Sequence, residues 1–394
     1  MEEIVIKHRP RRQSPVQKHR SQQGVGLACL LVSVILLITL FGLIAKDRAF
    51  SENENRNLAQ KPELSWSALQ SGTYLSDLST YYADQFPGRD SWLSIQLWLN
   101  QMLGSREAGG VYLCKDHYLM QVPGEANEEH LEKNLKEMDA FAKANPDVNM
   151  VASIIPNAVT IHADKLPKNA PVRDQRADLA RIDGALDHVG FVDVTEKLCT
   201  YSQEQLFYRT DHHWTSLAAA YAFEEIAPAL GLQAPPLSSY TRYTVSATFE
   251  GTLSSKSGSH KARDKVELFV PKTEVEYFVQ RPDSEAVCTM YHREALSAKD
   301  HYTVFFGGNY PRIDISTTAE TGKNLLVFKD SYANCFVQFL YPYFENITII
   351  DPRYYYDNVD TIMNSGGITD VLFLYNLDTF LGDSSLADVL LAGN

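Results

Sequence analysis

The clearest pattern along the chain is an uncharged apolar run from Gly24 to Ala45. Its length matches a helix that crosses a bilayer, whereas the apolar region of a cleaved signal peptide usually has about 7–15 residues. Six basic residues precede the run and two follow it closely, and this asymmetry places the N-terminus in the cytoplasm. We therefore predict a basic cytoplasmic tail at 1–23, a transmembrane anchor at 24–45, and an extracytoplasmic remainder.

The rest of the chain alternates helical and strand-like patterns. Residues 46–65 read as an extended juxtamembrane segment, and 66–394 as one extracytoplasmic domain. Helical periodicity predicts helices, and continuous apolar runs predict buried strands; the helices fall at 66–103, 125–145, 173–187 and 217–230, and the strands at 148–156, 191–195, 324–328, 347–351 and 371–375. This alternation predicts an α/β fold, a parallel sheet with helices on both faces. Residues at about 240–320 alternate apolar and polar positions instead, which predicts an antiparallel β insertion.

Composition and charge narrow the class of protein. The chain has 394 residues, of which 44% are hydrophobic and 22% charged, as in a globular protein. The net charge is −13; residues 1–48 carry +5, so residues 49–394 carry −18. Such an acidic body is a poor nucleic-acid binder. Four cysteines outside the apolar run either form up to two disulfides or stay buried thiols, and both readings remain open: Cys114, Cys199, Cys288 and Cys335.

The segment Thr210 to Thr215 (TDHHWT) carries the most specific chemistry. Side chains two positions apart in an extended segment point the same way, so Asp211 would orient His213 and stabilise its cationic form. That pair is the base half of an acyl-transfer triad. His212 takes a supporting role, and Trp214 reads as core or as a wall of the site. The other histidines lack metal-ligand spacing, so we expect neither a metal nor a cofactor.

Ser331 is the candidate nucleophile, because it follows an apolar strand and precedes a predicted helix. Backbone N–H groups at such a turn can face an oxyanion. Ordinary helix capping by Asp-Ser is the alternative reading, and the Asp-x-His motif favours catalysis. Polar residues also follow the other predicted strands, where parallel sheets gather their chemistry: Asn157, Arg353 and Asn376.

Several motifs together resemble the DHHW protein family, which belongs with the alginate O-acetylation proteins among SGNH-hydrolase-like proteins. They are TDHHWT, GGN at 307–309, KDSYAN at 329–334, ENRNL and DQFPGRD. The resemblance implies an SGNH-type fold with circularly permuted motifs, in which Asp211 and His213 precede Ser331. It also implies that Asn376 and the Ser331 amide bind the oxyanion. Arg353 and Asn309 are lesser candidates for oxyanion or sugar contacts. The usual Gly-Asp-Ser and GxND signatures are absent, and Lys329-Asp330-Ser331 stands at the nucleophile.

The resemblance implies an extracytoplasmic serine O-acetyltransferase or acetylesterase that modifies a cell-surface or secreted glycan through an acetyl-serine intermediate. A multi-span membrane acyltransferase would be the partner that supplies acetyl groups. The alternative is a noncatalytic glycan-binding or envelope-assembly protein on the same fold. The sequence does not identify the acceptor glycan or distinguish transfer from hydrolysis.

Overall fold

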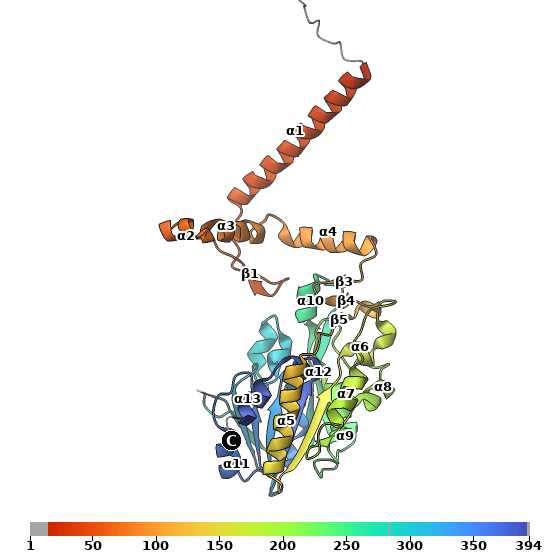
Figure 1. The fold of residues 1–394 in the computed structure, drawn as a ribbon, viewed down its shortest axis with the longest axis vertical. Helices are drawn as coiled ribbons and strands as arrows, with labels where there is room; N and C mark the ends of the chain where they lie inside the picture. Colours follow the sequence, from red (N-terminus) through yellow and green to blue (C-terminus); the bar gives the residue numbers. More distant parts are fainter. Residues whose placement is uncertain (1–14, 283, 392–394) are drawn as a thin grey trace, which may run out of the picture. The chain divides into compact units, whose positions relative to one another are not determined.

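The computed structural model describes residues 15–282 and 284–391, which divide into two compact units. The first comprises the chain up to Glu52 and Arg56–Ile95; the second comprises Asn53–Asn55 and the chain from Gln96 onward. Figure 1 shows the course of the chain through both. The main sheet lies in the second unit.

The first unit is helical. Its elements are α1 (Pro15–Ile44), the short strands β1 (Phe50–Ser51) and β2 (Arg56–Asn57), α2 (Trp66–Ser71), α3 (Thr73–Asp84) and α4 (Arg89–Met102), which continues into the second unit. Within α1, Gln23–Gly42 has a mean hydropathy of 2.7 and is the one stretch in the described chain long and apolar enough to cross a membrane. Of the predicted basic tail, residues 1–14 lie outside the described residues.

The motifs ENRNL and DQFPGRD meet inside this unit. The Arg56 guanidinium donates to both carboxylate oxygens of Asp84, at 2.8 and 2.6 Å, and the Ala59 backbone N–H donates to the same carboxylate. These hydrogen bonds, with that from Arg56 foremost, outweigh burial and lower the pKa of Asp84 to about 2. The ion pair therefore fastens the extended segment after α1 to the end of α3.

A seven-stranded mixed sheet forms the centre of the second unit, in the order β10-β11-β13-β12-β14-β6-β7. The strands are β6 (Asn149–Ile155), β7 (Gly190–Phe191), β10 (Tyr277–Gln280), β11 (Arg312–Thr317), β12 (Asn324–Lys329), β13 (Asn346–Ile350) and β14 (Asp370–Asn376). The last five in this order, from β13 to β7, are parallel, and β10 and β11 extend the sheet antiparallel at one edge. The predicted α/β fold is confirmed with a sheet that is mostly parallel.

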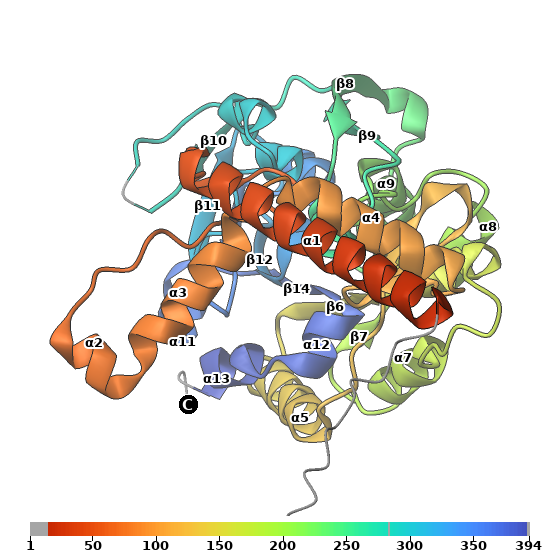
Figure 2. The same cartoon turned by 90° about the horizontal axis from the view of Figure 1, so that it is seen from above.

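Successive strand residues supply two separate cores, as expected for a sheet covered on both faces. Leu325 and Val327 of β12 pack in one core, Leu326 and Phe328 in the other. The first core includes α8 (Thr195–Thr200) and α9 (Ser216–Ile226); the second includes α5 (Glu128–Ala144), α7 (Gln175–Asp183), α11 (Val359–Ser365), α12 (Leu377–Gly382) and α13 (Ser385–Leu391). Figure 2 shows α5, α12 and α13 on one side of the strands and α9 on the other.

The region from 240 to 320 divides into two parts. β8 (Tyr240–Phe249) and β9 (Asp264–Pro271) form an antiparallel hairpin, as the alternating pattern indicated. β10 and β11 instead join the edge of the main sheet. The remaining elements include a small antiparallel sheet of β3 (Glu107–Ala108), β4 (Val111–Leu113) and β5 (Leu119–Gln121), together with α6 (Ala158–Ile161) and α10 (Thr252–Ser257).

Two predicted elements differ from those observed. The segment after Ser331 forms short 3-10 helices, the first at Ser331–Cys335, rather than an α-helix. Its aromatic and β-branched residues, with Pro342, disfavour a continuous α-helix. The strand expected at 191–195 is reduced to Gly190–Phe191, because α8 begins at Thr195. All five cysteines, each in the described part of the chain, are free thiols.

Candidate active site

The carboxyl ends of the parallel strands bring the candidate residues to one edge of the sheet. Phe328 of β12 pairs with Ile350 of β13, and Asn376 of β14 pairs with Ile155 of β6. Ser331 follows β12 by two residues, so the nucleophile candidate lies where these strands end together. Parallel strands place their termini at a common edge, which is the usual location of a site in this class of sheet.

Asp211 and His213 lie in a loop between Phe207 and Trp214, which we call the base loop. Backbone pairing between Phe207 and Trp214 closes this loop. Its entry is held by Asp264 of β9, whose carboxylate accepts from the backbone N–H groups of Arg209 and Thr210 and from the Thr210 hydroxyl. Burial raises the pKa of Asp264, although these hydrogen bonds oppose the rise. The sequence pattern gave no indication of this anchor, because the β8–β9 hairpin brings it to the loop from 54 residues away.

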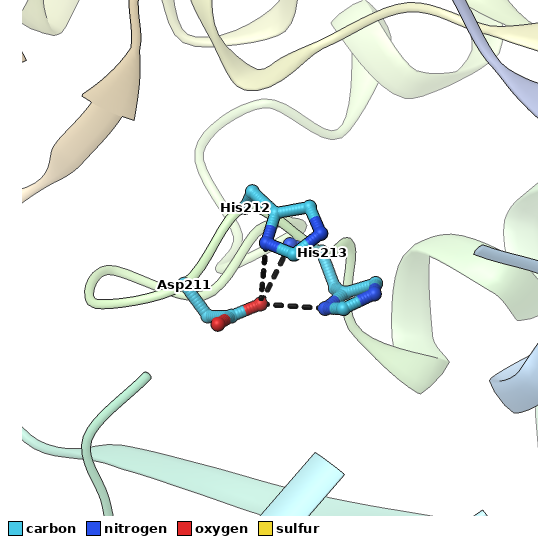
Figure 3. Close-up of side chains that lie close together, drawn as sticks. All are labelled: Asp211, His212 and His213. Carbon is cyan, nitrogen blue, oxygen red and sulfur yellow. Dashed lines mark hydrogen bonds and ion pairs between the residues drawn. The ribbon is translucent and has the colours of Figure 1, made fainter. Parts of the chain in front are cut away.

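Three side chains form a continuous hydrogen-bonded relay. His213 Nδ1 lies 2.6 Å from Asp211 Oδ1, and His213 Nε2 lies 2.8 Å from Ser331 Oγ. An ionised carboxylate only accepts hydrogen bonds, so Nδ1 carries the proton and Nε2 accepts from the serine hydroxyl. Figure 3 shows the carboxylate of Asp211 beside both histidine rings. The arrangement is that of a serine, a base and an orienting acid.

The second oxygen of Asp211 is held by α10. Thr252 donates to Oδ2 from its backbone N–H at 2.8 Å and from its hydroxyl at 2.9 Å. Burial acts to raise the pKa of Asp211, but His212, His213 and these hydrogen bonds outweigh it and hold the pKa well below its usual range. A Cβ placed on Gly251 would lie 2.3 Å from the Cβ of Asp211. Neither Gly251 nor Thr252 was expected from the sequence, since nothing local marks their approach to the base loop.

His212 contacts Thr252 and Asp211, and its side chain is partly exposed. Its Nδ1 is 3.0 Å from the Thr252 hydroxyl oxygen. Since that hydroxyl donates to Asp211, it accepts here, and Nδ1 of His212 is the donor. Burial, together with the charge of His213, lowers the pKa of His212 to about 3. His212 therefore supports the carboxylate as a neutral ring, as the supporting role assigned from the sequence requires.

Tyr302 joins the base to the nucleophile from a third direction. Its ring stacks on the His213 imidazole, with centroids 3.8 Å apart and planes 14° apart. Its hydroxyl donates to the Ser331 carbonyl oxygen at 2.8 Å. Tyr302 lies in the predicted β insertion, and sequence reasoning did not identify it.

Asp330, rather than Ser331, caps the turn after β12. Its Oδ1 accepts from the Tyr332 backbone N–H at 2.9 Å, and its Oδ2 accepts from the Asn376 backbone N–H at 3.0 Å. The capping interpretation of the Asp-Ser pair thus applies to the aspartate, which leaves the serine hydroxyl to the histidine. Trp214 is fully buried and donates from Nε1 to the Tyr332 carbonyl oxygen. Trp214 is therefore a core residue, shielded from solvent, that joins the loop of Asp211 and His213 to the turn after β12.

A buried ionic network lies beneath this turn. Lys329 Nζ donates to Asn309 Oδ1, Asn334 Oδ1 and Asp351 Oδ2, at 2.9, 2.8 and 3.3 Å. Arg353 makes a two-pronged ion pair with Asp351. Burial lowers the pKa of Lys329, against the attraction of Asp351. Asn309 and Arg353 thus have structural partners here, and their contacts with an oxyanion or a sugar stay predictions.

Asn376 caps α12 through its Oδ1, which accepts from the Asp378 backbone N–H. The same oxygen accepts from Asn157 Nδ2 at 3.3 Å. Among the described residues, its Nδ2 makes only a 3.5 Å contact with the Ile155 carbonyl oxygen, so this donor is weakly engaged. Its role as an oxyanion donor remains a prediction.

Asp211, His212 and His213 also offer three possible metal ligands within 4.8 Å of one another. Three protein ligands suit a catalytic zinc site. Here a hydrogen bond joins His213 Nδ1 to Asp211 Oδ1, and another joins His213 Nε2 to Ser331 Oγ. A metal would have to displace the proton between the first two, so these donors fit a proton relay better than a metal centre.

Comparison with known proteins gives this geometry a family context. Residues 113–290 match the family model described as an SGNH hydrolase-like domain, acetyltransferase AlgX. A relative in Pseudomonas syringae pv. tomato, named probable alginate O-acetylase AlgJ, is 27% identical over 238 residues. That match covers 56% of this chain and 59% of the relative, so the chain spans less than two thirds of that protein.

Two solved structures have the same fold. A DHHW family protein from Eubacterium siraeum superposes with a TM-score of 0.63 and 24% identity, covering 71% of this chain and 95% of that one. PatB1 from Bacillus cereus superposes with a TM-score of 0.57 and 20% identity, covering 68% and 97%. These findings confirm the resemblance seen in the sequence. Residues 113–290 are thus similar to the SGNH hydrolase-like domain of the AlgX type, and the chain shares its fold with a DHHW family protein.

Proposed function

We propose that this protein is a membrane-anchored, extracytoplasmic serine O-acetyltransferase or acetylesterase that acts on a cell-surface or secreted polysaccharide. One observation carries the proposal: Asp211, His213 and Ser331 form an unbroken hydrogen-bonded relay with 2.6 and 2.8 Å contacts. Paired with the match to an acetyltransferase family model, this geometry favours acyl transfer over simple binding.

In the first half of the reaction, Ser331 Oγ attacks the carbonyl carbon of an acetyl ester while His213 Nε2 removes the hydroxyl proton. Asp211 stabilises the imidazolium that forms. The tetrahedral intermediate collapses as His213 returns the proton to the departing alcohol, which leaves acetyl-serine. We assign the oxyanion to the Ser331 backbone N–H and, as a second donor, to Asn376 Nδ2.

In the second half, His213 deprotonates an incoming hydroxyl, which attacks the acetyl carbon and releases Ser331. A sugar hydroxyl yields an acetylated glycan, whereas water yields free acetate. The two outcomes share every residue, so the choice between transferase and esterase depends on which hydroxyl reaches the acyl-enzyme. The name of the AlgJ relative supports a polysaccharide acceptor, without identifying it.

The strand order supports a circular permutation of the fold. Numbered from the serine strand, β12, β13, β14, β6 and β7 are first to fifth, and their order in the sheet is 2-1-3-4-5. That is a familiar order among doubly wound sheets. We infer that the permutation explains why the base loop precedes the nucleophile in this chain.

The location is proposed from the apolar stretch of α1, whose described residues are almost all exposed. As a signal anchor it would hold the site outside the cell, where acetyl-CoA is not expected. An acetyl donor would then come from a multi-span membrane acyltransferase beside the anchor helix.

The experiment that tests the triad is hydrolysis of p-nitrophenyl acetate by the full-length protein in detergent. Wild type should release p-nitrophenol and form acetyl-serine at Ser331, detectable by mass spectrometry of the peptide. Ser331→Ala and His213→Ala should lose about 10³-fold or more in kcat, as for a triad member. Ser238→Ala, an exposed serine in the same unit, is the matched control and should keep full activity.

Two results would contradict the proposal. Activity that survives in Ser331→Ala would exclude the acetyl-serine route. No activity in wild type towards activated esters, with normal glycan binding, would favour the noncatalytic interpretation. An arm with a chelator separates the relay from the metal alternative, because the relay should be unaffected by EDTA.

A further inference from the structure

The three helices that follow the apolar stretch of α1, and the turn between the last two, expose large apolar side chains. We call these the juxtamembrane apolar residues: Trp66, Leu69, Leu75, Phe86, Trp92 and Ile95. Trp66 is 76% exposed and Trp92 52% exposed. Three of the four tryptophans of the chain are exposed in α2 and α4, and the fourth, Trp214, is fully buried in the sheet unit.

Helix α4 shows the pattern most clearly. Trp92, Ile95, Leu99 and Met102 recur at helical spacing on one face, and all four are exposed. No residue of α4 is buried. An isolated helix of 14 residues is marginal in water without an apolar surface to pack on. This face therefore requires an occupant.

The position of the helices relative to α1 identifies that occupant. A Cβ on Gly42, at the end of the apolar stretch, would lie 3.5 Å from the Pro87 ring in the turn between α3 and α4. Phe41 and Phe86 line the same cleft of about 300 Å³. Arg48 pairs with Asp90 at 2.9 Å and so holds the start of α4 at this point. The turn is thus fixed where the apolar stretch ends.

The composition of the helices favours lipid over a charged surface. Only four residues between 66 and 103 are charged, and three of them take part in ion pairs within the unit: Asp77, Asp84, Arg89 and Asp90. Tryptophan is enriched at the boundary between the hydrocarbon core and water. Amphipathic helices with Trp, Phe and Leu on one face bind in that boundary. The absence of lysine from this segment removes attraction to anionic lipid as the driving force.

We infer that α2, α3 and α4 lie on the surface of the lipid bilayer, with the juxtamembrane apolar residues buried at headgroup level. This inference rests on the proposed function only in that α1 is taken to cross the membrane. Hydrophobic burial is the source of binding, so zwitterionic lipid is sufficient. Neither the triad nor the identity of the acceptor glycan enters the argument.

The test is tryptophan fluorescence of the full-length protein in phosphatidylcholine vesicles, with lipids brominated either near the headgroup or near the bilayer centre. The comparison variant combines Trp66→Phe, Trp92→Phe and Trp98→Phe, so that buried Trp214 is its sole tryptophan. We expect shallow bromine to remove most of the wild-type emission and to leave the variant unchanged. Deep bromine should quench the wild type less, and added salt should not change the result.

Each other outcome overturns the inference. Quenching of wild type by aqueous iodide, with no effect of bromolipid, would show that the helices face water. Protection from both quenchers would show that the helices pack on protein. Because the vesicles contain only this chain, quenching by bromolipid could not be caused by another protein. Carbonate extraction of the same vesicles reports the anchor separately. Loss of the protein from the membrane fraction would refute the anchor, whereas retention without quenching would refute only the surface helices.

Discussion

Gly251 packs against Asp211 so closely that a single added methyl group should disturb the Asp211–His213 pair. Its backbone conformation is ordinary, at φ −85°, so alanine would not strain the chain. The added methyl group would overlap the Cβ of Asp211, at 2.3 Å, and push the carboxylate away from His213. Because a misplacement of about 1 Å can cost about 100-fold in rate, we expect Gly251→Ala to lower kcat by roughly that factor, measured with p-nitrophenyl acetate.

Gly124→Ala is the matched control for this substitution. A Cβ at Gly124 would have no heavy atom within 4 Å, and its backbone is likewise outside the left-handed region. It should keep wild-type kcat. If Gly251→Ala were fully active, the carboxylate would not need the position that it occupies here.

Two substitutions separate the contributions of Tyr302 to activity, which are its stacking on His213 and its hydrogen bond to the Ser331 carbonyl oxygen. Tyr302→Phe keeps the stacking on His213 and loses the hydrogen bond to the Ser331 carbonyl, worth about 1 kcal/mol. Tyr302→Leu loses both. We expect the phenylalanine variant to fall a few-fold in kcat and the leucine variant by a further order of magnitude, with a shifted pH–rate profile. Equal losses in both variants would show that the ring contact contributes nothing.

His162 provides a pH-dependent contribution to stability away from the site. It is fully buried between Tyr118 and Phe207. Burial, assisted by Lys165, lowers its pKa to about 4 from the model-peptide value of 6.5. Between these values the unfolded chain binds the proton and the folded chain does not. Stability is therefore present above pH 6.5 and is lost as the pH falls towards 4, by about 3 kcal/mol.

The measurement is urea unfolding of wild type and His162→Phe across this pH range. Phenylalanine fits the aromatic surroundings and cannot be protonated, so the difference between the two curves isolates this group. We expect the variant to lose less stability on acidification. Parallel curves would mean that His162 accepts a proton in the folded state as readily as in the unfolded one.

At the scale of elements, Asn309 joins its own loop to the end of β12 and to the 3-10 turn that follows that strand. Its Oδ1 accepts from Lys329 and from Asn334, at 2.9 and 3.0 Å. Asn309→Ala leaves both donors without this acceptor, and we expect a loss of about 1–3 kcal/mol in unfolding free energy. Asn309→Asp retains an acceptor oxygen beside the cation and should recover stability. A rise in KM for a glycan acceptor with unchanged stability would instead indicate a sugar contact.

The elements that could be predicted are those whose cause is local. The apolar runs of β6, β12, β13 and β14 predict buried strands, because continuous apolar sequence fits a sheet covered on both faces. Asp211, His213 and Ser331 could be named because a carboxylate, an imidazole and a hydroxyl occur at loops after such runs. Ser331 follows the apolar run of β12 directly, whereas Asp211 and His213 were identified by their Asp-x-His spacing in the loop after α8.

The remainder depends on tertiary approach. Gly251 and Thr252 come to Asp211 from 40 residues or more along the chain, and Tyr302 comes to Ser331 from 29 residues away. Their own neighbourhoods carry no periodic signal for that approach. The 3-10 turns after Ser331 have a local cause instead: aromatic and β-branched residues, with Pro342, disfavour the α-helix that is the default expectation after a parallel strand.

For the molecule as a whole, the cysteines predict how it responds to thiol reagents. Burial raises the pKa of Cys114 and that of Cys335 to about 12, which disfavours the reactive thiolate. Cys288 is exposed. Apart from Cys29, which is exposed within the apolar stretch of α1, we expect an alkylating reagent to modify Cys288 first in the native protein and Cys335 only after unfolding. In the denatured protein, all five thiols should react with the reagent without prior reduction. Two fewer reactive thiols would reveal a disulfide.

The strand order also links the site to the direction of synthesis. His213 leaves the ribosome 118 residues before Ser331, with Asp211 just ahead of it, and β14, which lies between β6 and β12 in the sheet, is made later still. Until then, β6 has only the two-residue β7 beside it. A growing chain therefore possesses its base long before it has a nucleophile to activate. The site can therefore become active only late in synthesis, once β12 and β14 have joined the partly formed sheet.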